Sequence, residues 1–207
     1  MRRSLLVGLL GMIACAPAAQ GQDSASQAQG DLPPVGFGTL NQDDIAVSLR
    51  LEDVEVRIVP LDERVLRLLA PDAYASLHGI LQSRAADIDT ITRRKGVAVP
   101  GILFVTFFGR RAGARFDPEN LNVIIRNQLY RAIGIVPYSS NFNSQQLDVR
   151  QQASGIFLYE VTLPVFEPFS ISYGASSSDA WEGKLTRIQR ERARVMGRGV
   201  RRDSTGN

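Results

Sequence analysis

Cysteine and histidine are almost absent from this chain, which has one of each among its 207 residues, Cys15 and His78. A disulfide needs two cysteines and a Cys/His zinc site needs several such ligands, so the sequence excludes both within one chain. Aromatic residues make up 7% of the chain, with Trp181 as the single tryptophan. Hydrophobic residues reach 44%, so we expect the fold to be held by a buried core rather than by cross-links.

No apolar run is long enough to span a bilayer, but a short one stands at the N-terminus. Arg2 and Arg3 precede an uncharged apolar stretch over residues 5–14, which small residues follow. This order of charged, apolar and small-residue regions is typical of a secretory signal, which we assign to residues 1–22. The sequence therefore predicts a protein exported to the periplasm or cell envelope, with no transmembrane segment after cleavage.

Two modes of cleavage fit this segment. Met12-Ile13-Ala14-Cys15 resembles the lipobox of bacterial lipoproteins, except that Met12 stands where that family usually has Leu. The resemblance implies that Cys15 is lipidated and becomes the anchored N-terminus. The alternative is ordinary signal peptidase cleavage at Ala16-Pro17-Ala18 or after Ala19-Gln20-Gly21, which releases a secreted protein without a lipid.

Acidic residues are scarce at the C-terminal end, so the net charge of +3 is unevenly distributed along the chain. Residues 23–183 carry 14 Lys and Arg against 19 Asp and Glu, a balance of −5, whereas residues 184–207 carry 8 against 2, a balance of +6. An exported protein with an acidic body is not expected to bind nucleic acid. An unknown envelope protein or an anionic membrane surface is the partner that the basic end suggests.

Hydrophobic periodicity predicts an α+β domain over residues 44–196, after a polar linker at 23–43 and before a disordered basic tail at 197–207. Helices are expected within 62–95: a short one capped by Asp62, then a long one from Pro71 to Gly96. A final helix should begin near Ser178 and pack through Trp181. Strands are expected from alternating or continuous apolar residues at 45–51, 54–60, 102–108, 121–125, 130–137, 147–149, 156–164 and 169–173.

The order of the later strands resembles a known family. FDPENLNVII, LYRAIGIVPYS, FLYEVTLP and FSISYG follow one another from Phe116, separated by turns and a polar loop. This rhythm is similar to immunoglobulin-like, telokin-type domains of exported bacterial proteins and lipoproteins of unassigned function. The resemblance implies a mainly antiparallel β-sandwich, here with a helical insertion and a C-terminal helix, and it supplies no catalytic residues.

Candidate chemistry is sparse, and we expect no catalytic residue, metal site or cofactor. The sequence has no G-x-S-x-G nucleophile motif that could form a catalytic triad with His78. Asp87 and Asp89 point in different directions on a helix, so they cannot bind one ion together. Arg110, Arg111 and Arg115 form the best candidate ligand site, a glycine-flanked loop suited to a small anion. The alternative is that these arginines protect the end of an apolar strand from edge pairing.

These observations favour a non-enzymatic binding or assembly module of the cell envelope. One alternative is a small-anion or ligand-binding protein, or an enzyme, that uses the loop from Arg110 to Arg115. Another is a purely structural lipoprotein.

Overall fold

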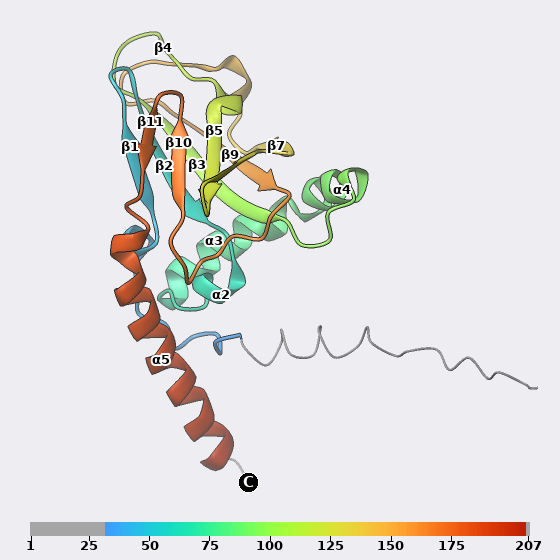
Figure 1. Cartoon of the computed structure of the whole chain (residues 1–207), viewed down its shortest axis with the longest axis vertical. Helices are drawn as coiled ribbons and strands as arrows, with labels where there is room; N and C mark the ends of the chain where they lie inside the picture. The colour runs from blue at the N-terminus through green and yellow to red at the C-terminus, as the bar shows by residue number, and fades with distance from the viewer. Residues whose placement is uncertain (1–31, 206–207) are drawn as a thin grey trace, which may run out of the picture. The chain divides into compact units, whose positions relative to one another are not determined.

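The computed structural model describes residues 32–205, with side chains up to Arg198, so Cys15 and the predicted signal lie outside the described residues. The larger sheet has five antiparallel strands in the order β1-β2-β3-β9-β7 (Figure 1). These strands are β1 (Val47–Arg50), β2 (Val54–Pro60), β3 (Gly101–Gly109), β9 (Gln152–Tyr159) and β7 (Gly134–Pro137). The apolar strand β3 lies at the centre of this sheet, as predicted from its continuous hydrophobic run.

A second sheet has four antiparallel strands in the order β11-β10-β5-β6. Its strands are β11 (Ser176–Ser178), β10 (Ser170–Tyr173), β5 (Leu121–Ile125) and β6 (Gln128–Arg131). A two-stranded ladder joins β4 (Ala114–Arg115) to β8 (Gln146–Leu147), and short 3-10 turns lie at Gln42–Asp44 (η1), Pro118–Asn120 (η2) and Phe142–Ser144 (η3). The fold is therefore α+β with mostly antiparallel sheets, as expected.

Aromatic side chains connect the two sheets through a common core. The Phe107 ring of β3 lies 5.6 Å from the Tyr173 ring of β10 and 4.4 Å from the Phe116 ring. The buried hydroxyl of Tyr159 on β9 donates to the carbonyl of Leu121 on β5, 3.3 Å away. Apolar residues of both sheets thus belong to one buried cluster, and such burial is the main favourable term in folding.

The β1–β2 hairpin confirms the first pair of predicted strands. Val47 pairs with Ile58 and Leu49 with Val56, so the alternating apolar residues of both strands share the buried face. The Leu51 N–H donates to the carbonyl of Val54 and closes a turn at Glu52-Asp53, which explains the change of phase at that pair.

The helical insertion differs from the prediction in one respect. The short helix α2 (Glu63–Leu66) is capped by Asp62, which accepts from the Arg64 N–H, as predicted. The predicted long helix is two helices, α3 (Pro71–Ser83) and α4 (Ala85–Lys95), with a break at Arg84. The break lets Leu77 on α3 face the main core while Ile88 on α4 packs in a separate cluster with Val136 and Leu158. Gly96 ends α4 with a φ of 69°, the left-handed conformation that suits glycine.

The predicted return strand at 130–137 is also divided. β6 pairs with β5 in the four-stranded sheet, whereas β7 pairs with β9 in the larger one. The chain crosses between sheets at 132–133, and its next residue, Gly134, lies so close to the Ile91 side chain of α4 that a Cβ there would be 2.6 Å from it. The prediction of one continuous strand was wrong because strand periodicity is the same whichever sheet supplies the partner.

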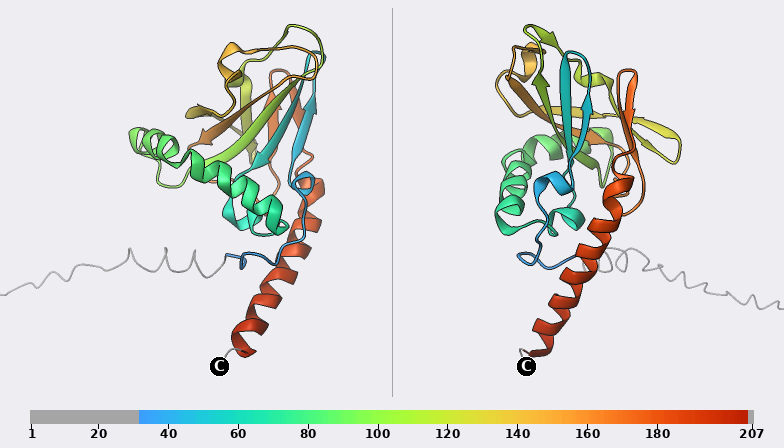
Figure 2. Two further views of the ribbon diagram at one scale, coloured as in Figure 1. Left: turned by 180° about the vertical axis from the view of Figure 1, so that it is seen from behind. Right: turned by 90° about the vertical axis from the view of Figure 1, so that its left-hand side faces the viewer.

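The C-terminal helix α5 (Glu182–Thr205) is longer than the sequence predicts. Residues 197–205 are helical, although we expected disorder from Gly197 onward. A helix whose first turns are already packed extends at low cost through residues such as Arg that form helices readily. Figures 1 and 2 show α5 running from the end of β11 past α2 and α3 and beyond the sheets.

Candidate functional site

Helix α5 is attached to the rest of the domain by an apolar stripe on its first half. Trp181, which directly precedes the helix, is 1% exposed and lies 5.0 Å from the Phe169 ring between centroids. Leu185, Ile188 and Val195 continue the buried stripe. Trp181 is therefore a core residue as predicted, and its buried indole N–H has no hydrogen-bond partner among the described residues.

Polar contacts join the same half of α5 to the segment that leads into β1. Lys184 Nζ donates to the Asp43 carbonyl over 2.8 Å, and Arg187 lies 2.6 Å from the Asp44 carboxylate. Both acidic residues belong to η1. Both basic side chains in the first two turns of α5 thus contact this segment, Lys184 through a hydrogen bond to a carbonyl and Arg187 through an ion pair.

Glu191 is the centre of the next contact, and only 7% of it is exposed. One carboxylate oxygen accepts from the Thr39 N–H at 2.7 Å and from the Thr39 hydroxyl at 2.8 Å, and the other accepts from Arg194 Nε at 2.7 Å. Arg194 also donates to the Phe37 carbonyl over 2.6 Å. The hydrogen bonds from Arg194 and Thr39 outweigh burial and hold the pKa of Glu191 below its ordinary value.

Sequence reasoning missed this contact, which we call the Thr39–Glu191 clasp (Thr39, Glu191 and Arg194). The spacing of Glu191 and Arg194 on one helix was a local signal for an ion pair. Thr39, however, lies 152 residues away in a segment assigned to a flexible linker. No pattern in the linker distinguishes Thr39 from its neighbours, so only the folded chain places it.

The predicted anion loop does not bring its three arginines together. Arg110 donates to the Leu51 carbonyl, and Arg111 lies 2.7 Å from Glu52 and 3.3 Å from Asp53. These two arginines therefore pair with the β1–β2 turn. Arg115 lies apart on β4, makes no ion pair with the described residues and lines a hollow of about 510 Å³ with Gln146 and Tyr173. Anion binding at this loop stays a prediction that rests mainly on Arg115.

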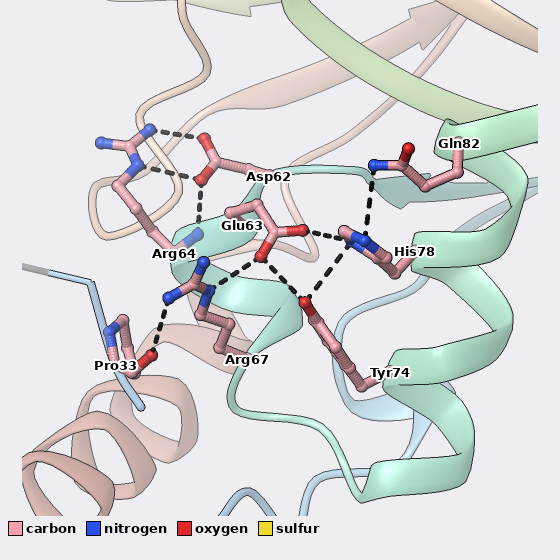
Figure 3. A network of polar contacts seen from close by, with 8 residues as sticks. All are labelled: Pro33, Asp62, Glu63, Arg64, Arg67, Tyr74, His78 and Gln82. Atoms are coloured by element: carbon pink, nitrogen blue, oxygen red, sulfur yellow. Dashed lines mark hydrogen bonds and ion pairs between the residues drawn. The ribbon is translucent and has the colours of Figure 1, made fainter. Parts of the chain in front are cut away.

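His78 belongs to a polar network between α2 and α3 (Figure 3). Its Nδ1 lies 2.7 Å from one Glu63 oxygen, and the other oxygen accepts from Arg67 Nε at 2.8 Å and from the Tyr74 hydroxyl at 3.3 Å. The Tyr74 and His78 rings are stacked with centroids 5.2 Å apart. Arg67 also donates to the Pro33 carbonyl, so the network reaches the segment that precedes Phe37.

This network joins α2 to α3. Burial raises the pKa of Glu63, but hydrogen bonds from Arg67 and His78 and their charges outweigh it, so the pKa lies below its ordinary value. His78 Nε2 faces the Gln82 side chain at 3.4 Å rather than a hydroxyl or thiol nucleophile. The geometry fits a contact between α2 and α3 better than a general base.

A polar hollow of about 570 Å³ lies where the two sheets end in strands β6 and β7. Asp117, Glu119, Asn122 and Arg131 line it together with residues 132–135. The Asp117 carboxylate is already used, because it caps η2 by accepting from the Glu119 N–H. Within residues 32–205, no group of three or more His, Cys, Asp or Glu is placed to hold a metal ion.

Comparison with known proteins supplies no relative. No protein-family model, curated protein or solved structure matches this chain. None of the helices in the described part of the chain is both long and apolar enough to cross a membrane.

Proposed function

We propose that this chain is an exported, non-enzymatic binding or assembly module of the bacterial cell envelope, and that α5 contacts its partner. Export is inferred from the signal-like residues 1–22. The role of α5 is inferred from its length beyond the core.

One observation carries the proposal for α5: the helix continues to Thr205, well past Val195, the last buried residue among those whose side chains are described. Val195 is fully buried, Gly197 and Arg198 are exposed, and the helix runs on to Thr205. At 1.5 Å per residue, the ten residues after Val195 extend about 15 Å. We infer that this projecting end of the helix contacts an external partner.

We also propose that the two sheets form an immunoglobulin-like sandwich. The contacts of Phe107 with Tyr173 and of Tyr159 with Leu121 support face-to-face packing of the sheets. A sandwich of this kind serves as a rigid support for a binding element at one end.

Export is tested by the intact mass of the protein purified from the envelope and cytoplasmic fractions of its host. We expect a chain that begins at Cys15 with an added acyl mass, or an unmodified chain that begins between Ala16 and Asp23. A stable cytoplasmic protein that retains Met1 to Ala14 would contradict the envelope role.

The role of α5 is tested by a photo-crosslinking residue at position 198 in living cells. Position 94, exposed near the end of α4, is the matched control because it also replaces an exposed arginine in the C-terminal part of a helix. We expect crosslinked products from position 198 and background levels from position 94. Background levels at both positions refute α5 as the contact.

A further inference from the structure

We propose that the partner of α5 is the surface of an anionic lipid bilayer, which the helix contacts beside the point where the chain enters the domain. This inference rests on the proposed export, because the domain must reach the envelope to meet such a surface. It adds the chemistry of the partner and the orientation of the domain.

Basic positions follow one side of α5 along its whole length. At 100° per residue, seven of its eight basic residues fall within an arc of about 120°. These positions are Lys184, Arg187, Arg190, Arg194, Arg198, Arg201 and Arg202, and Arg192 falls outside the arc. Asp203, the only acidic residue after Glu191, falls on the opposite side of the helix by the same spacing. The helix therefore has a continuous basic side, which we call the α5 basic side.

Among the described residues, the domain supplies acidic partners to only two arginines of the α5 basic side. Asp44 pairs with Arg187, and Glu191 pairs with Arg194 beside Thr39. Arg190 and Arg198 are exposed and make no ion pair with any described residue, and positions 201 and 202 follow on the same side of the helix by spacing. Arg190 and Arg198 are thus the described cations of the basic side that an external anion could reach.

The chain enters the domain against the middle of the same helix. The Phe37 carbonyl accepts from Arg194, and a Cβ on Gly38 would lie 2.2 Å from the Leu68 backbone carbon, so this segment runs closely between α5 and the end of α2. Figure 2 shows residues 32–40 beside α5, at the end of the domain where the helix projects. A membrane attachment through the N-terminal segment would thus act on the end of the domain at which α5 projects.

The charge distribution also favours an orientation in which α5, rather than the rest of the domain, faces the membrane. Residues 23–183 have a balance of −5 and would be repelled by an anionic surface, whereas residues 184–207 have a balance of +6 and would be attracted. An arginine close to an anionic bilayer strengthens binding by about fivefold.

The test measures sedimentation with vesicles of phosphatidylglycerol and phosphatidylethanolamine, and with neutral phosphatidylcholine vesicles. The protein is the chain from residue 16 to 207, which contains every described residue and cannot be lipidated at Cys15. We expect binding to the anionic vesicles only, and weaker binding as salt rises from about 0.05 to 0.5 M, because salt screens exposed charges.

The matched variants remove three charges each. Arg198→Gln/Arg201→Gln/Arg202→Gln changes the distal half of the α5 basic side and should lower the vesicle partition coefficient by about 100-fold, from the fivefold contribution of each arginine. Arg93→Gln/Arg94→Gln/Lys95→Gln changes the exposed end of α4 and should lower it by less than about threefold, because long-range charge is screened. Fluorescence of Trp181 confirms that both variants are folded.

Three results overturn the inference: no binding to anionic vesicles, equal losses in the two triple variants, or preferential binding of nucleic acid or an acidic protein through the same residues. None of these results contradicts the envelope role if mass spectrometry shows that the signal has been cleaved from the protein. Conversely, an unprocessed chain found in the cytoplasm refutes the proposed function, even if the purified protein binds anionic vesicles.

Discussion

At the scale of single residues, Trp181 is the side chain on which the attachment of α5 depends most. It is among the largest fully buried side chains and contacts Phe169. We expect Trp181→Ala to lower the free energy of unfolding by about 3–5 kcal/mol, because it removes buried apolar surface and leaves a cavity. Urea or guanidinium denaturation followed by circular dichroism measures this change.

Trp181→Phe is the matched control. It keeps an aromatic ring in the site and removes the indole N–H that has no partner, so it should cost less than about 1.5 kcal/mol. Equal losses for the two substitutions would show that the ring does not anchor the helix. A neutral Trp181→Ala would place the indole outside the core.

Glu191 is the second residue whose removal should loosen α5. Glu191→Gln keeps the shape of the side chain but replaces charge-assisted hydrogen bonds from Thr39 and Arg194 with neutral ones. We expect a loss of about 1.5–3 kcal/mol near pH 7, the usual value of a hydrogen bond to a charged group.

The pH dependence follows from the pKa of Glu191, which lies below its ordinary value of 4.5. A carboxyl whose pKa is lowered by folding stabilises the fold above the ordinary value, and this stabilisation is lost as pH falls through the folded value. The difference between the wild type and Glu191→Gln should therefore be constant above about pH 5.5 and shrink below pH 4.5. A difference that stays constant down to pH 3 would show that the charge of Glu191 contributes nothing.

At the scale of elements, the distal turns of α5 should be dispensable for stability. Gly197 and Arg198 are exposed, and Val195 is the last buried residue of the helix among those whose side chains are described. Deletion of residues 197–207 should change the free energy of unfolding by no more than about 0.5 kcal/mol, as for surface changes away from packed features. A fall of several kcal/mol in the same denaturation experiment would show that these turns pack on the domain.

Local signals predicted the elements whose limits are set by neighbouring residues. Asp62 caps α2 and Gly96 ends α4, as their positions in the sequence indicated. The break at Arg84 was not predictable, because the apolar stripe from Tyr74 through Leu77 to Ile88 continues at helical spacing across it. The helix breaks because its two halves pack against different clusters.

At the scale of the whole molecule, the described domain should unfold as one unit. A single buried cluster includes residues from both sheets, from α2 and α3 and from α5, among them Phe107, Leu77 and Ile188. Shared packing of this kind makes unfolding cooperative in domains of this size. The Trp181 fluorescence transition should coincide with the far-ultraviolet circular dichroism transition. A fluorescence change at lower denaturant would show that α5 detaches before the sheets unfold.

The sequence by itself was enough to predict the α+β class, the strands around β3, the cap of α2 and the burial of Trp181. These features depend on side-chain periodicity and on capping groups within a few residues, which a linear pattern contains. The skewed charge was equally visible, and it indicated the basic end before α5 was seen.

Only the tertiary structure decided which sheet each half of 130–137 joins, how Arg110 and Arg111 are paired and that Thr39 holds Glu191. Arg111 is separated from Glu52 by 59 positions and Thr39 from Glu191 by 152. Such contacts form because the core brings distant segments together, and their energy depends on geometry that no local spacing specifies. A charged residue in the sequence is therefore a candidate for binding until the fold shows whether a partner within the chain already occupies it.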